Sequence, residues 1–92
     1  MSDVSSHVLV TVQNPQGLHM RPADMLVKMA GRFTSNIVIE RAGQQVDCKS
    51  ILGILTLGAT QGSELKIMAD GPDAQQAIAE IAGLFDRSFD EE

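Results

Sequence analysis

A histidine and an arginine stand close together in residues 17–23, which read Gly-Leu-His-Met-Arg-Pro-Ala. Proline is tolerated in the first turn of a helix, so Pro22 predicts that His19 lies at a helix start with Arg21 beside it. Backbone N–H groups without helical partners, the positive end of the helix dipole and the guanidinium would then meet at one imidazole. This combination favours a site that holds a phosphoryl group.

Phosphoryl transfer to His19 requires a neutral imidazole, because a ring nitrogen must offer its lone pair to phosphorus. After transfer, Arg21 and the backbone donors would stabilise the dianionic group by charge-assisted hydrogen bonds. Gly17 would allow a close approach, and a position in a loop would keep the ring accessible. An arginine in a first helical turn opposes the helix dipole, which favours a functional reason for its presence. An ordinary cap-region histidine beside a solvated arginine is the structural alternative.

A second segment, residues 49–58, begins with Lys-Ser and continues as a short apolar run that ends in glycine. This pattern predicts a short helix with Ser50 as its N-cap. Apolar residues occupy nearly every side of so short a helix, so some of them must be exposed. We expect the exposed ones, with the methionine beside His19, to dock partner proteins, although an apolar surface without a partner is the alternative. This docking surface consists of Met20, Ile51, Leu52 and Leu55.

The composition limits the possible functions. The chain has 92 residues, a formal net charge of −5 and 3% aromatic residues, which argues against a nucleic-acid-binding protein. No apolar run is long enough to span a membrane, and one cysteine cannot form an internal disulfide, so a cytoplasmic protein is expected. His7 and Cys48 lack metal-ligand spacing relative to His19, so neither a metal nor a cofactor is expected. Paired carboxylates, a Cys–His pair and a P-loop are not recognisable, which leaves independent enzymatic turnover as a weak hypothesis.

Hydrophobic periodicity predicts seven elements in the order β-α-β-β-α-β-α. Amphipathic helices and half-apolar strands in this order favour an α+β domain whose antiparallel or mixed sheet is covered on one face. The acidic residues 86–92 are expected to be a solvated, frayed chain end. The expected elements are strand 7–12, helix 20–31, strands 36–40 and 44–48, helix 51–57, strand 63–70 and a helix that starts at 71–73.

Residues 17–23 and 49–58 together resemble two motifs of the histidine-containing phosphocarrier proteins (HPr) of the bacterial phosphoenolpyruvate-dependent sugar phosphotransferase system. The resemblance extends over the chain from His7 to Phe85. It implies an open-faced β-sandwich in which a four-stranded antiparallel sheet carries three helices on one face. Residues 1–92 would then form a single HPr-like phosphocarrier domain.

The resemblance also implies a role for each matched residue. His19 would accept a phosphoryl group from phosphorylated enzyme I and pass it to the IIA domains of sugar permeases, assisted by Arg21. Ser50 matches the serine that an HPr kinase/phosphorylase modifies in many members. Met20 and Gln16 stand where members usually have smaller residues, which affects the expected choice of partner. A monomeric carrier is expected.

Two alternatives to a sugar-transport carrier follow from the same residues. The chain could be a nitrogen-branch or purely regulatory HPr paralogue, which would retain the phosphoryl chemistry and change the partners. It could also be a non-catalytic α+β protein-binding module whose histidine is incidental. Labelling with phosphoenolpyruvate and a general enzyme I distinguishes a carrier from such a module.

Overall fold

The computed structural model describes residues 4–90 of the chain. The expected elements are present with small shifts at their ends, and a short 3₁₀ turn, η1, follows the last helix. The elements are β1 (Val4–Thr11), α1 (Met20–Ala30), β2 (Asn36–Arg41), β3 (Gln44–Asp47), α2 (Ile51–Thr56), β4 (Glu64–Gly71), α3 (Ala74–Asp86) and η1 (Ser88–Asp90).

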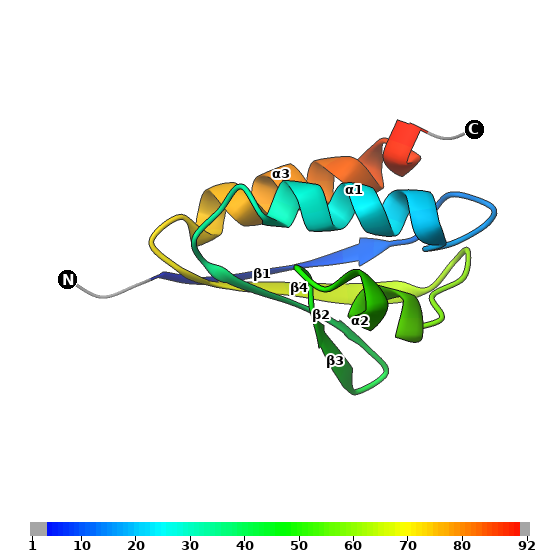
Figure 1. Cartoon of the computed structure of the whole chain (residues 1–92), viewed down its shortest axis with the longest axis horizontal. Helices are drawn as coiled ribbons and strands as arrows, with labels where there is room; N and C mark the ends of the chain where they lie inside the picture. Colours follow the sequence, from blue (N-terminus) through cyan, green and yellow to red (C-terminus); the bar gives the residue numbers. More distant parts are fainter. Residues whose placement is uncertain (1–3, 91–92) are drawn as a thin grey trace.

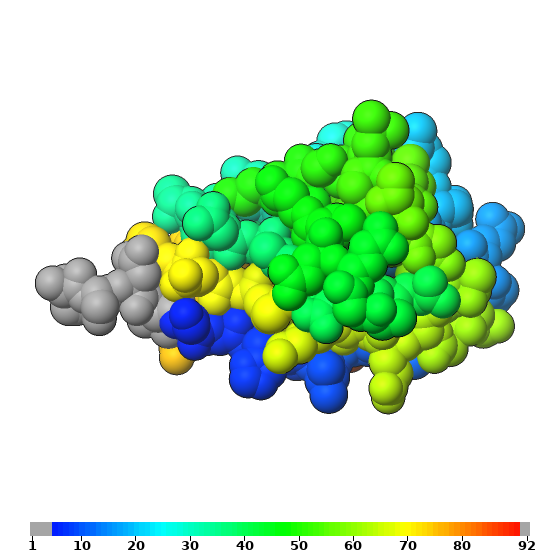
Figure 2. Space-filling view, turned by 90° about the horizontal axis from the view of Figure 1, so that it is seen from below, coloured from blue at the N-terminus to red at the C-terminus, as the bar shows by residue number. Residues whose placement is uncertain are grey.

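The four strands form one antiparallel sheet in the order β1-β4-β2-β3. The long helices α1 and α3 lie side by side over one face of this sheet (Figure 1), while the short α2 follows β3 and contacts α1. Figure 2, seen from below, shows β1 in blue, β4 in yellow and the β2–β3 region in green next to one another. The molecule is therefore an open-faced α+β sandwich, as the resemblance implies.

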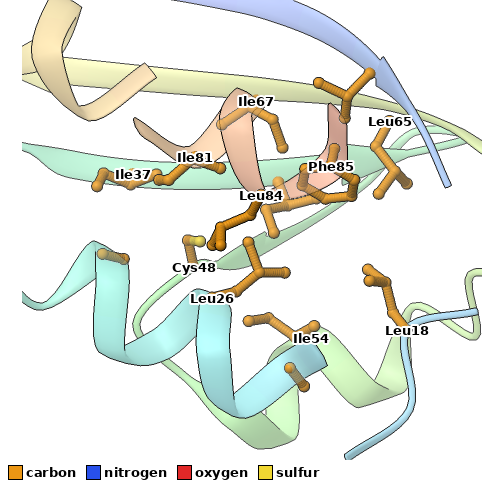
Figure 3. Close-up of a cluster of buried hydrophobic side chains, with 14 of the residues drawn as sticks. Leu18, Leu26, Ile37, Cys48, Ile54, Leu65, Ile67, Ile81, Leu84 and Phe85 are labelled. Carbon is orange, nitrogen blue, oxygen red and sulfur yellow. The ribbon is translucent and has the colours of Figure 1, made fainter. Parts of the chain in front are cut away.

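Alternation along the strands explains why only one face of the sheet is covered. In β4, Leu65 and Ile67 are buried, whereas the intervening Lys66 is only half-buried. Figure 3 shows side chains from β2 and β4 meeting those of the helices, with Leu26 from α1 and Ile54 from α2 among them. Full burial of each large aliphatic side chain contributes about 1.5–3 kcal/mol, so this single core stabilises the layers on each other.

The expectation of a solvated, frayed C-terminal end is wrong at Phe89, whereas the charged side chains of Asp86, Arg87 and Asp90 are exposed as expected. Phe89 is fully buried, and its ring packs edge-to-face against Phe85 with the centroids 4.9 Å apart. The chain kinks after α3 in η1, where Phe89 has non-helical backbone angles and its side chain is part of the core. Residues 91 and 92 of that segment lie outside the described residues. The expectation was based on the acidic residues of this segment and did not take account of the one apolar side chain among them, that of Phe89.

The start of α3 is tied to the start of β2 by a carboxylate. Asp73, the N-cap of α3, accepts hydrogen bonds from the backbone N–H groups of Thr34 and Ser35, both at 2.9 Å. The Ser35 hydroxyl also donates to this carboxylate, and together these bonds lower the pKa of Asp73 from 3.8 to about 2. The Asp73 side chain therefore does not cap α3 itself but joins the start of α3 to the start of β2.

Candidate functional site

His19 lies where the sequence predicts it, at the N-cap of α1. Its backbone is extended, with φ −86° and ψ −166°, and its carbonyl accepts the first helical hydrogen bond from Ala23 at 3.0 Å. The imidazole itself makes no capping hydrogen bond, and the residue is only partly buried. The imidazole therefore does not cap the helix that it precedes.

The loop before His19 is held by short-range backbone hydrogen bonds and by a second segment. The Gly17 carbonyl accepts from the His19 N–H at 3.0 Å, and the Leu18 N–H donates to the Ala59 carbonyl at 2.9 Å. Gly17 has a φ of +70°, and a Cβ at this position would overlap the Ala59 carbonyl oxygen. Glycine is thus required at position 17 for two independent reasons, conformation and space.

Asn14 is a site residue that the sequence analysis did not identify. Its side chain is 1% exposed, and its Nδ2 donates to the Gly17 carbonyl at 2.6 Å, while the Gly17 N–H donates to the Asn14 carbonyl at 3.1 Å. This pair of bonds closes the turn that presents His19. The available signal was an asparagine before Pro15, a pair typical of turns, but the pattern indicates only a break and not a buried side chain.

Arg21 stands in the first turn of α1, where the sequence places it, with its side chain exposed. Its Nη1 donates to the backbone carbonyl of Phe89 at 3.1 Å. The first turn of α1 contains no acidic residue. Within that turn, the guanidinium therefore does not share the helix end with a carboxylate that would oppose an incoming anion.

Ser50 is the N-cap of α2, as predicted. Its hydroxyl accepts a hydrogen bond from the Gly53 N–H at 3.1 Å, and its own N–H donates to the Asp47 carbonyl at 3.0 Å. The preceding residue, Lys49, binds elsewhere: its Nζ donates to the Phe33 carbonyl at 2.9 Å. Ser50 is half-buried and belongs to a well-formed cap.

The residues of the expected docking surface differ in exposure. Met20 is 62% exposed and Leu52 is 72% exposed, whereas Ile51 and Leu55 are half-buried and pack against the core. These residues lie on α1 and α2, which contact each other. The sequence analysis did not include Leu9, which is 69% exposed and lies on the uncovered face of β1.

A second site would have to come from the remaining metal-ligating and nucleophilic side chains of residues 4–90. Within residues 4–90, His, Cys, Asp and Glu side chains form no group of three that could hold a metal ion. Burial, reinforced by the negative charge of Asp47, raises the pKa of the Cys48 thiol to about 12. Cys48 is therefore a small core residue and not a nucleophile. No helix in the described part of the chain is long and apolar enough to cross a membrane.

Comparison with known proteins agrees with this geometry. Residues 7–87 match the family described as PTS HPr component phosphorylation site. The phosphocarrier protein HPr of Treponema pallidum is 42% identical over 83 residues, which cover 90% of this chain and 94% of that protein.

Solved structures agree as well. A crystal structure of HPr-C-His from Thermoanaerobacter tengcongensis superimposes with a TM-score of 0.91 at 39% identity, covering 95% of this chain and 98% of that one. A crystal structure of an HPr dimer from the same organism gives a TM-score of 0.77 at 39% identity, covering 91% and 97%. This chain belongs to the HPr family, the phosphoryl carriers of the phosphotransferase system.

Proposed function

We propose that this HPr-family chain carries its phosphoryl group on His19 and that Arg21 stabilises the phosphorylated state. The observation that supports this assignment is the start of α1, where a partly buried imidazole without a capping role and a guanidinium share one turn. Backbone donors and the helix dipole at such an end favour a dianion. The same groups can thus receive the phosphoryl group and retain it.

The transfer step exchanges one N–P bond for another. A lone pair on an imidazole nitrogen of His19 attacks phosphorus in line with the bond to the donor's phosphorylated histidine. That bond breaks, and the donor imidazole leaves with the electron pair. Arg21 supplies charge-assisted hydrogen bonds to the phosphoryl oxygens as negative charge gathers on them. The reverse geometry delivers the group to the next histidine.

Phosphorylated enzyme I is the proposed donor, and the IIA domains of sugar permeases are the proposed acceptors. Each must bring its own histidine to the start of α1, so each must bind the surface around His19. The exposed side chains of Met20 and Leu52 lie on the two helices next to that site and support its use for docking. We propose that the chain acts as a monomer in the cytoplasm, which keeps this surface open to successive partners.

Ser50 is proposed as a regulatory site for an HPr kinase/phosphorylase. A phosphate there would add a charge of about −1.5 to −2 at a helix N-terminus, where the dipole tolerates it. The fold would persist. The new charge would lie beside Ile51 and Leu52, where an approaching acidic partner must repel or desolvate it, so phosphorylation of His19 would become slower.

Labelling with phosphoenolpyruvate and a general enzyme I tests the assignment. We expect one phosphoryl adduct on the protein, labile in acid and stable in base, as a phosphoramidate requires. His19→Ala should abolish the adduct. The control is His7→Ala, which removes the second histidine of the chain, an exposed residue of β1, and should leave the adduct unchanged. Labelling of the His19→Ala variant at histidine, or its retention of the full adduct, would show that another residue accepts the group.

A further inference from the structure

One hydrogen bond joins the start of α1 to the C-terminal turn. Arg21 Nη1 donates to the Phe89 carbonyl at 3.1 Å across 68 residues of sequence. Figure 1 shows η1, drawn in red, at the same end of the molecule as the start of α1. Because the acceptor is a backbone carbonyl, a substitution at position 89 can affect this bond only by moving the turn.

The turn that carries the carbonyl has an unfavourable backbone. Ser88, Phe89 and Asp90 have φ angles of 52°, 55° and 59°, all in the left-handed region, and none of them is glycine. A Cβ atom makes this conformation costly at each position. Three such residues in succession persist only where other contacts offset the cost.

The Phe89 side chain supplies such a contact. Its ring is fully buried and meets Phe85 of α3 edge-to-face at an interplanar angle of 70°. The Asp90 N–H donates to the Arg87 carbonyl at 2.9 Å, while the ion pair between the same two residues is solvent-exposed and contributes little. The buried ring therefore anchors the turn and, with it, the carbonyl that Arg21 binds.

We propose that Phe89 is a positioning residue for phosphoryl transfer, because its buried ring fixes the turn whose carbonyl holds the Arg21 guanidinium at the helix end that bears His19. This inference rests on the proposed roles of His19 and Arg21. A long arginine side chain has many rotamers, and a fixed acceptor lowers the entropy that is lost when Arg21 engages an anion. When the phosphoryl group arrives, its charged oxygens attract the guanidinium more strongly than a neutral carbonyl does, so Arg21 exchanges one acceptor for the other.

A double-mutant cycle between positions 89 and 21 tests this role. The measured quantity is the single-turnover rate of phosphoryl transfer from phosphorylated enzyme I to each folded variant. Phe89→Ala is expected to slow transfer about fivefold when Arg21 is present, and to change the rate by less than about 1.5-fold in an Arg21→Ala background. Phe89→Leu retains an apolar anchor and should slow transfer about twofold. If Phe89→Ala does not fold, the double-mutant cycle is measured with Phe89→Leu instead.

Leu84→Ala is the matched control, since Leu84 is a buried residue of α3 that does not belong to the turn. Its transfer rate should equal that of the wild type wherever urea unfolding shows it to be folded. The NMR signal of the Arg21 Nε–H group should move in Phe89→Ala and stay in place in Leu84→Ala.

The outcomes separate this inference from the function on which it depends. If the wild-type protein accepts no phosphoryl group, the proposed function fails. If the wild type is labelled but Phe89→Ala slows transfer equally with and without Arg21, Phe89 has only a structural role. An unchanged rate in folded Phe89→Ala and Phe89→Leu would likewise overturn the positioning role.

Discussion

The starts of α1 and α2 are built in opposite ways although both lie on the proposed partner-facing side. The Ser50 hydroxyl accepts from the Gly53 N–H and closes the start of α2, whereas the His19 side chain makes no such bond at the start of α1. The N-cap side chain of α2 thus caps its own helix, and the N-cap side chain of α1, proposed to carry the phosphoryl group, does not. The difference shows that a residue's place in a helix does not by itself decide its role.

Among the substitutions at the two helix starts, charge reversal at Arg21 should slow phosphoryl transfer to His19 the most. Arg21→Glu places a like charge against the phosphoryl group, so transfer to His19 is expected to fall by about 100-fold or more. Arg21→Lys keeps the charge but loses the planar fork, and a loss of about tenfold is expected. Single-turnover rates with phosphorylated enzyme I measure both. Arg32→Glu makes the same charge change at an exposed residue beyond α1 and should have little effect. Equal losses at both arginines would indicate a general electrostatic effect.

A negative charge at the α2 start should have a smaller effect on the same reaction. Ser50→Asp is expected to slow phosphorylation of His19 about fivefold, because the charge lies beside the docking surface. Aspartate is also a good N-cap, so the helix should persist. Ser50→Asn caps equally well without the charge and should react like the wild type under the same salt condition. A Ser50→Asp variant as fast as Ser50→Asn would leave Ser50 with its capping role alone.

Alanine substitution compares the two starts by stability instead of rate. Ser50→Ala loses a capping hydrogen bond and should lower the free energy of unfolding by about 1 kcal/mol. His19→Ala loses no capping bond, so a change within about 0.5 kcal/mol is expected. Urea unfolding at neutral pH measures both values. A larger cost at His19 than at Ser50 would reverse the comparison and make His19 a structural residue.

Acid should reveal a third kind of helix start, at Asp73. Its folded-state pKa of about 2 lies below the ordinary 3.8, so its carboxylate stabilises the fold above pH 3.8 and loses this effect as the pH falls toward 2. The effect is expected to be small. Asp73→Asn should lower the thermal midpoint at pH 6 and differ less from the wild type near pH 2. A constant difference between the two proteins across this range would contradict the assignment.

Local patterns predicted most of the fold because each element carries its own signal. Periodicity predicted the strands in which Val10, Leu65 and Ile67 are buried, and the serine before an apolar run indicated the cap of α2. The segment around His19 indicated a helix start from Pro22 and a tight turn from Gly17. These features depend on neighbours within a few residues, which a single sequence displays.

Long-range contacts account for what the sequence did not predict. The bond from Arg21 to Phe89 joins the start of α1 to the turn after α3, and the bonds from Thr34 and Ser35 to Asp73 join the start of β2 to the start of α3. The burial of Phe89 could have been suspected, since it follows Phe85 by four residues and so continues the apolar stripe of α3. The surrounding acidic residues outweighed that signal, and three successive left-handed residues have no sequence signature outside glycine and asparagine.

Cys48 gives the protein a built-in reporter of how often its α2 region opens. The thiol is fully buried between β3 and α2, two positions before Ser50, and its N–H donates to the Ile37 carbonyl at 2.8 Å. With a pKa of about 12, the thiol is essentially unreactive while it stays in the core. A thiol reagent should therefore label only molecules in which this junction has transiently separated. The labelling rate would report the local opening equilibrium beside Ser50 in the protein with its natural sequence.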